Sequence, residues 1–268
     1  MRFIVVFIAT FLCINQPALL IAGETKVVKA QSKRGVTQPF LFVVPDKPKA
    51  GVVLFVGGDG VLKLSDYGKI SGNKNNFFVR TYRKFAEQGL MVALVDIPSD
   101  KKKGALFRLS KNHAQDISAV IKVMTKKADV PIWLVGTSMG SLSAASVGLK
   151  KQAKVAGMVL TASVSRPGKG KGLKKLTAKY PDGVAGLNLQ KFKKPALIVS
   201  HTEDSCKVSP PADAAKIKAK LSNSPRVEVV LLEGGKDTKS DVCKGLSRHG
   251  FFGIEDKAVK KIVNFIAR

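Results

Sequence analysis

The stretch of residues 130–146 constrains this sequence more than any other, because it joins a buried strand, a tight turn and a helix. Residues 132–135 are apolar, as expected for a strand covered on both faces. They are followed by Gly136-Thr-Ser138-Met-Gly140 and then by small residues that favour a helix. In a Gly-x-Ser-x-Gly turn between strand and helix, the serine sits at a sharp, strained bend. The two glycines allow close backbone contacts that a Cβ would block; the alternative is an ordinary turn rich in glycine and serine.

A serine at this bend is a candidate nucleophile. Ser138 would lie at the start of a helix, where free N–H groups favour negative charge. A serine hydroxyl needs a base, and the base needs a carboxylate. The chain has three histidines, and only His249 lies late enough for the order serine, acid, histidine that accompanies such a turn. We predict His249 as the base, His113 as a packing or capping residue at an exposed or half-buried helix start, and His201 as a residue that could line the pocket.

The acid is expected in the loop that follows a strand at residues 196–200. Two carboxylates in that loop compete, Glu203 and Asp204. Asp204 lies four residues past the strand and is the preferred acid. Whichever carboxylate is not used is expected to be a solvated loop charge.

An oxyanion hole needs two backbone N–H groups directed at a carbonyl oxygen that becomes negative. We expect one from Met139, the residue after the serine, and one from the glycine-rich turn at residues 57–60. Asp59 is the first choice for the second donor and Gly60 the second choice. Glycine-rich turns also bind phosphates, but no Gly-Lys-Ser/Thr follows this turn and no Gly-x-Gly-x-x-Gly is present.

The remaining sequence alternates between strand and helix patterns. Strands are predicted at residues 25–30, 38–44, 51–56, 90–95, 132–135, 155–160, 196–200 and 227–232. Helices are predicted at residues 77–88, 113–127, 211–221 and 255–267. This alternation predicts an α/β fold with a mostly parallel sheet and helices on both faces. The segment 165–191, rich in glycine and lysine, is expected to be irregular.

The N-terminus and the cysteines both point to export. Residues 1–23 have a short positive start, an apolar run and small residues before polar sequence, which is typical of a cleaved secretory signal; an uncleaved anchor is the alternative. Removing this segment leaves Cys206 and Cys243, and an even pair in an exported chain predicts a disulfide. Two buried free thiols are the alternative. The expected location is periplasmic or secreted, with no transmembrane span in the mature chain.

The formal net charge of +27 indicates which partners the protein could attract, and it does not indicate the fold. Basic residues are spread along the chain, and aromatic residues make up only 7% of it. Nucleic-acid binders usually gather basic charge on one element and interleave aromatic residues, so no specific nucleic-acid partner is predicted. A solvated basic surface is the favoured interpretation, and attraction to an anionic envelope surface or substrate is the second.

These features together resemble the α/β-hydrolase superfamily over residues 24–268, and most of all its small exported members with a cysteine pair beside the acid and the histidine. The matching positions are the turn at residues 57–60, Asp96 after a strand, Ser138, Asp204 and His249. The resemblance implies a single α/β-hydrolase domain of about eight strands without a large lid domain. It implies a serine hydrolase, esterase-like, that cleaves an ester or similar acyl bond through an acyl-enzyme, with no metal or cofactor.

Two departures from the family pattern matter. Asp59 stands where a His-Gly-Gly pattern is commoner, and the missing lid argues against a lipase of long-chain fats. The expected substrate is a small-molecule or polymer acyl compound. The alternatives are a hydrolase-fold protein that binds an anionic envelope polymer without catalysis, and a peptidase or thioesterase that uses the same three residues.

Overall fold

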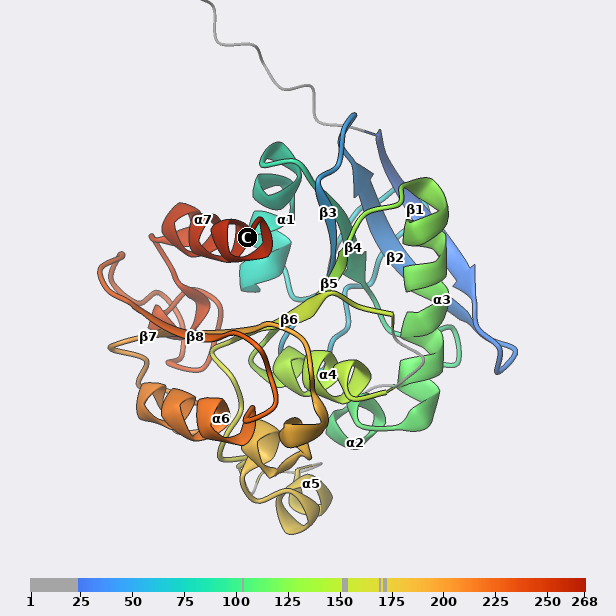
Figure 1. Cartoon of the computed structure of the whole chain (residues 1–268). Coiled ribbons are helices and arrows are strands. Elements are labelled where there is room, and N and C mark those ends of the chain that lie inside the picture. The colour runs from blue at the N-terminus through green and yellow to red at the C-terminus, as the bar shows by residue number, and fades with distance from the viewer. Residues whose placement is uncertain (1–23, 103, 151–153, 169, 171–172) are drawn as a thin grey trace, which may run out of the picture.

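The structure is a computed structural model that describes residues 24–102, 104–150, 154–168, 170 and 173–268. Within them, eight strands form one sheet in the order β1-β2-β4-β3-β5-β6-β7-β8 (Figure 1). They are β1 (Glu24–Gln31), β2 (Thr37–Val44), β3 (Ala50–Phe55), β4 (Leu90–Val95), β5 (Ile132–Thr137), β6 (Gly157–Thr161), β7 (Ala196–His201) and β8 (Val227–Leu232). Strand β2 is antiparallel to β1 and β4, and the other pairs are parallel. The predicted sheet is confirmed.

Helices cover both faces of this sheet (Figure 1). Helices α1 (Phe77–Glu87) and α7 (Glu255–Ile266) pack on one face. Helices α3 (Lys111–Lys127), α4 (Met139–Gly148) and α6 (Ala214–Lys220) pack on the other. The shorter helices are α2 (Ala105–Arg108), α5 (Lys174–Lys179) and the 3₁₀ helices η1 (Gly183–Gly186), η2 (Leu189–Lys191), η3 (Pro211–Asp213) and η4 (Arg248–Gly250). The described chain has no large lid domain, and the α/β-hydrolase fold expected from the resemblance is confirmed.

The core consists of two apolar layers, one on each face of the sheet. In β3, Val53 and Phe55 belong to one layer, and Val52 and Leu54 belong to the other. Successive side chains of a strand point to opposite faces, so a strand that is apolar throughout is buried on both. The continuous apolar runs of β3, β4 and β5 therefore place these strands in the middle of the sheet, and their carboxyl ends carry the turns of the site.

One segment is more regular than the sequence predicts. Residues 165–191 were expected to be irregular, but their described part contains α5, η1 and η2. Leu176 and Leu189 from this segment are buried in the apolar layer to which α4 also contributes side chains. Apolar side chains spaced among the glycines and lysines thus anchor short helices to the core, and the prediction was wrong on this point.

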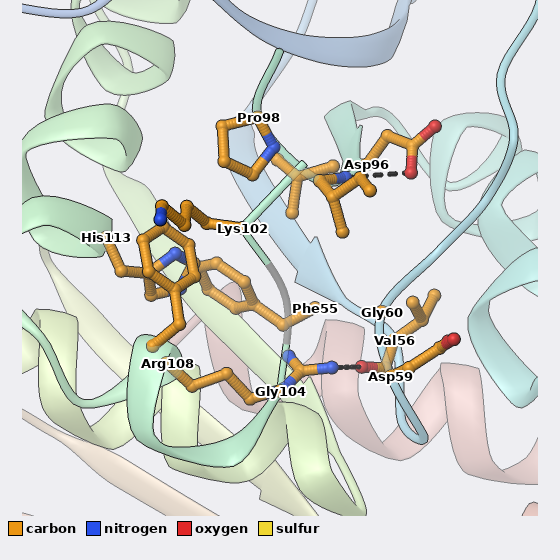
Figure 2. Close-up of a pocket in the computed structure, with 13 residues that line it drawn as sticks. Phe55, Val56, Asp59, Gly60, Asp96, Pro98, Lys102, Gly104, Arg108 and His113 are labelled. Atoms are coloured by element: carbon orange, nitrogen blue, oxygen red, sulfur yellow. Dashed lines mark hydrogen bonds between the residues drawn. The ribbon is translucent and has the colours of Figure 1, made fainter. Parts of the chain in front are cut away.

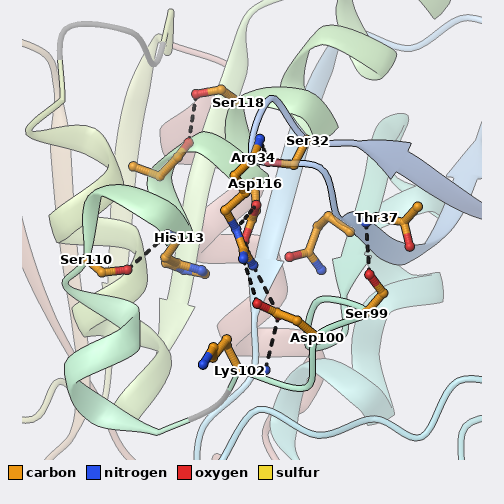
Figure 3. A network of polar contacts seen from close by, with 12 residues as sticks. Ser32, Arg34, Thr37, Ser99, Asp100, Lys102, Ser110, His113, Asp116 and Ser118 are labelled. Carbon is orange, nitrogen blue, oxygen red and sulfur yellow. Dashed lines mark hydrogen bonds and ion pairs between the residues drawn. The ribbon is translucent and has the colours of Figure 1, made fainter.

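A partly buried ion network ties the turn between β1 and β2 to α3 and to the loop after β4 (Figure 3). The Arg34 guanidinium donates two hydrogen bonds to Asp116, at 2.7 and 2.8 Å, and two to Asp100, at 2.6 and 3.2 Å. The Asp116 side chain is fully buried. Both carboxylates raise the pKa of Arg34 above its ordinary value, mainly through these hydrogen bonds. The hairpin is thereby fixed to the helix that covers it.

His113 is more deeply buried than the sequence predicts. It lies near the start of α3, whose cap is Ser110, with only 7% of its surface exposed, so the expectation of an exposed or half-buried position was wrong. Its ring contacts the rings of Phe55 and Phe107, at centroid distances of 5.8 and 5.4 Å. Burial, with smaller contributions from the charges of Arg108 and Arg34, lowers the pKa of His113 to about 3. His113 is therefore a neutral packing residue.

The expected signal at residues 1–23 lies outside the described residues. Among the helices of the described chain, none combines the length and the apolar character needed to cross a membrane.

Candidate active site

Ser138 occupies a strained bend between β5 and α4. Its backbone has φ 52° and ψ −125°, a region that residues other than glycine rarely adopt. A Cβ at position 136 would overlap the Gly140 carbonyl, and a Cβ at position 140 would overlap the Phe55 carbonyl. The Ser138 N–H donates to Thr161 O in β6 at 2.9 Å and fixes the bend to the sheet. The Gly-x-Ser-x-Gly pattern is thus a steric requirement of this turn.

Asp204 and His249 form a buried pair beyond the carboxyl end of β7. Asp204 Oδ2 lies 2.9 Å from His249 Nδ1, although the two residues are 45 positions apart. Both side chains are at most 5% exposed. A carboxylate in this position selects the tautomer that carries the proton on Nδ1 and leaves Nε2 as an acceptor. Nε2 is buried and has no hydrogen-bond partner among the described residues.

The other candidate acid lies elsewhere. The carboxylate of Glu203 is 66% exposed and lies 3.4 Å from the Arg248 side chain. His201, which on its position in the sequence could have lined the pocket, is instead buried. Its Nδ1 accepts the Glu203 N–H at 3.0 Å, and its Nε2 lies 2.8 Å from Gly234 O. His201 therefore shapes the loop after β7 that carries Asp204, called the acid loop below, rather than the cleft.

A disulfide joins the acid loop to the segment between β8 and α7 that carries His249, called the histidine loop. Cys206 and Cys243 are bonded, with their Cα atoms 4.8 Å apart, and they are 37 positions apart in the sequence. The Cys206 N–H also donates to Asp204 Oδ1 at 2.9 Å. The bridge thus joins Cys206, which hydrogen-bonds Asp204 directly, to Cys243, which lies six positions before His249.

Ser209 is a member of this network that the sequence analysis missed. Its Oγ donates to Asp204 Oδ2 at 3.2 Å and lies 3.0 Å from His249 Nδ1. The residue is 1% exposed. Its position depends on the turn in which its N–H donates to Cys206 O, and no motif in the sequence marks it.

Ser138 and His249 open on one cleft of about 470 Å³. Within the described residues no direct hydrogen bond joins the side chains of Ser138 and His249, and catalytic hydrogen bonds are often loose in the absence of substrate. Most of the lining residues are polar residues or glycines, among them Ser71, Asn73, Lys74, Asn75, Asn76, Ser240, Lys244 and the glycines 57, 58, 245 and 250, and Phe77 and Cys243 also contribute. No aspartate or glutamate lies among the described residues that line the cleft.

The glycine-rich turn at residues 57–60 lies against Ser138. Gly57 and Gly58 line the cleft, and a Cβ on Gly57 would approach Ser138 Cβ to 3.0 Å. The Gly60 N–H already donates to Gly57 O at 3.2 Å, so the structure corrects the second choice of donor: Gly60 is not free to bind a substrate oxygen. Asp59 and Gly60 border a neighbouring pocket (Figure 2). Met139, the other expected donor, begins α4 directly after Ser138.

Asp204, Cys206 and His249 also bring three metal-ligand atoms within 4.8 Å of one another. This donor set does not fit a metal ion. The Cys206 sulfur is bonded to Cys243 and is no thiolate, and Asp204 Oδ2 is directed at His249 Nδ1. The cluster is explained by the disulfide lying beside the acid–base pair.

Comparison with solved structures supports this fold. The esterase Pf2001 of Pyrococcus furiosus is 14% identical, with 91% of this chain and 92% of that chain covered and a TM-score of 0.62. Est1E of Butyrivibrio proteoclasticus is 15% identical, with 91% and 100% covered and a TM-score of 0.60. Dipeptidyl peptidase 4 of Porphyromonas gingivalis is 12% identical, with 90% of this chain and 36% of that chain covered and a TM-score of 0.59. These likenesses concern the fold.

No curated protein matches the chain. Residues 72–209, about half of the chain, match a family model described as serine aminopeptidase, S33. The matched region runs from the loop before α1 through the Ser138 bend to Ser209 in the acid loop. On this match and on its fold, the chain belongs to the serine aminopeptidase S33 family of α/β hydrolases.

Proposed function

We propose that this protein is a serine hydrolase that cleaves an ester or similar acyl bond through an acyl-enzyme on Ser138. The observation that carries the proposal is the buried Asp204–His249 pair, whose histidine keeps Nε2 without a hydrogen-bond partner among the described residues and lines the same cleft as the strained Ser138 bend. His249 accepts the Ser138 proton as Oγ attacks the acyl carbon, and then donates it to the leaving group. Asp204 orients the imidazole and stabilises its charged form. Water, activated by His249, then releases the acyl group.

The lining of the cleft supports a polar or anionic substrate. Pockets for hydrocarbon chains are lined mainly by apolar side chains. The residues that line this cleft include serines, asparagines and the two lysines Lys74 and Lys244, and no aspartate or glutamate is among the described ones. We propose an acyl substrate with a carboxylate or phosphate near the scissile bond.

Peptide-bond cleavage is a second candidate, favoured by the description of the matching family as an aminopeptidase. An aminopeptidase must hold the positive α-amino group of its substrate, and a carboxylate is the usual partner for such a group. The described cleft lining offers two lysines instead. The positive charge of these lysines therefore favours an ester substrate over a peptide with a free α-amino group.

The test combines active-site labelling with a substrate panel. A fluorophosphonate probe should label the wild-type protein and not Ser138→Ala, whereas Ser146→Ala, on the same helix, should label normally. We expect hydrolysis of p-nitrophenyl acetate and faster hydrolysis of mono-p-nitrophenyl succinate. The double variant Lys74→Ala with Lys244→Ala should raise KM for the succinate and not for the acetate. Labelling that survives in Ser138→Ala would overturn the mechanism, and exclusive cleavage of aminoacyl p-nitroanilides would establish the second candidate.

We further propose that the protein works outside the cytoplasm. The disulfide and the signal-like residues 1–23 support this location, because disulfides persist in oxidising compartments. The net charge of +27 supports contact with an anionic envelope. N-terminal mass analysis of exported protein, and binding to anionic vesicles at low and moderate salt, test both points. Salt-sensitive binding without probe labelling would instead favour the non-catalytic binding protein.

A further inference from the structure

A buried guanidinium lies behind the glycine-rich turn (Figure 2). Arg108, the last residue of α2, is only 6% exposed. Its Nη2 donates to Val56 O at 3.0 Å and to Gly58 O at 3.2 Å. Its Nη1 donates to Ser143 Oγ in α4 at 2.9 Å. One side chain thus connects the turn after β3 with the helix that begins beside the nucleophile.

This guanidinium is charged but has no carboxylate partner in the described chain. Burial lowers the pKa of Arg108 to about 10, which still leaves it protonated at neutral pH, and Asp59 is the acidic group that opposes this effect. The adjoining pocket has a volume of about 30 Å³, room for a water molecule rather than an organic anion. A buried charge without a counter-ion costs more than a neutral side chain of the same size. Its position suggests a role in the turn that it contacts.

The hydrogen bonds of Arg108 fix the direction of specific N–H groups. In a planar trans peptide the C=O and N–H bonds point in opposite directions. Because Arg108 binds Val56 O and Gly58 O, the N–H groups of Gly57 and Asp59 point away from the guanidinium. The carbonyl between them, Gly57 O, accepts the Gly60 N–H. Three consecutive carbonyls are therefore held, and the turn has little freedom to flip a peptide.

The contact between Arg108 and the turn requires a residue without a Cβ at position 60. It has φ +84°, and a Cβ on it would approach Arg108 Nη2 to 2.8 Å. The turn is therefore folded directly against the guanidinium, with no side chain between them.

We propose that Arg108 is a positioning residue for the oxyanion hole. It holds the Gly58–Asp59 peptide with its N–H on the side away from the guanidinium, and its charge adds to the potential that favours an oxyanion. The inference rests on the acyl transfer proposed for Ser138. Removing one oxyanion-hole donor lowers kcat by about 10²- to 10³-fold, so losing the residue that positions one should lower kcat by about 10- to 100-fold.

The test compares Arg108→Met and Arg108→Lys in the full protein with p-nitrophenyl acetate as substrate. We expect kcat to fall by about 10- to 100-fold in Arg108→Met with little change in KM, and the rate of fluorophosphonate labelling to fall by a similar factor. Arg108→Lys keeps the charge but lacks the planar fork, so its kcat should be intermediate. The matched control is Arg226→Met: Arg226 stacks on Phe265 at 4.1 Å and donates to the Phe265 carbonyl at 2.9 Å, next to the start of β8.

Chemical rescue separates positioning from a purely structural effect. In Arg108→Ala, added methylguanidinium should restore part of kcat, and methylammonium should restore less. Wild-type kcat in Arg108→Met, or an equal loss in Arg226→Met, would overturn the inference while leaving the Ser138 mechanism intact. If Arg108→Met does not fold, the Lys variant and the rescue give the same answer. A wild-type protein without labelling or turnover would instead overturn the proposed function, and this inference with it.

Discussion

Replacing both bridged cysteines with serine should destabilise the protein and slow its catalysis. The bridge closes a loop of 37 positions. In the chain-entropy relation, a loop of this size lowers the entropy of the unfolded chain enough to stabilise the fold by about 4 kcal/mol. A chain of this length loses roughly 2–4 °C of melting temperature per kcal/mol, so we expect Cys206→Ser with Cys243→Ser to melt about 8–15 °C lower.

The same change should affect turnover more than binding. The Cys206 N–H holds Asp204 Oδ1, and Asp204 Oδ2 holds His249. Without the bridge the two loops are free to drift, and a small displacement of an acid–base pair lowers kcat strongly while substrate contacts remain. We therefore expect a lower kcat with KM nearly unchanged.

The assay is thermal unfolding together with steady-state kinetics, after mass spectrometry of a non-reduced digest. Ser205→Ala is the matched control, because this exposed residue neighbours Cys206 and, within the described chain, its side chain makes a single hydrogen bond, of 3.4 Å to Glu203 O. It should leave both properties unchanged. Two freely alkylated cysteines in protein secreted under native conditions, or a double variant that melts with the wild type, would refute the reasoning.

Three further predictions concern single residues. The pKa of His113 is lowered to about 3, whereas its unfolded value is about 6.5, so the unfolded state binds the extra proton and stability falls as pH falls between these values. His113→Phe should reduce the loss of stability between pH 6.5 and 4.5 by on the order of 2 kcal/mol in urea titrations; equal losses would contradict this. Gly140→Ala should destabilise by about 3 kcal/mol or prevent folding, because its Cβ would overlap the Phe55 carbonyl; wild-type stability in denaturant would exclude that overlap. Ser209→Ala should lower kcat about 10-fold at unchanged KM through the lost hydrogen bond at Asp204, and an unchanged kcat would remove Ser209 from the site.

The sequence by itself determined the layered fold and the bend at Ser138. Strands β3, β4 and β5 are continuous apolar runs, and such runs are stable only where both faces are covered. The bend at Ser138 was predictable because its two glycines are required by contacts within a few residues and with the adjacent strand. Both signals can be read from a short stretch of consecutive residues, although one of the contacts that requires Gly140, with the Phe55 carbonyl, comes from β3.

Tertiary structure decided which groups around that turn come together. The sequence left Glu203 and Asp204 in competition, and only the folded loop places Asp204 against His249 and Glu203 in solvent. It ranked Gly60 as a donor without showing that its N–H is already used.

Ser209 and Arg108 were missed for the same reason. Ser209 contacts a histidine 40 positions away, and Arg108 contacts a turn about 50 positions earlier. A hydrogen bond forms only when the donor–acceptor distance is right to within a few tenths of an ångström, and these donors and acceptors lie on segments that meet only after the sheet has formed. No residue pattern along the chain encodes that meeting, and so the strands and the bend follow from the sequence while the polar network depends on the fold.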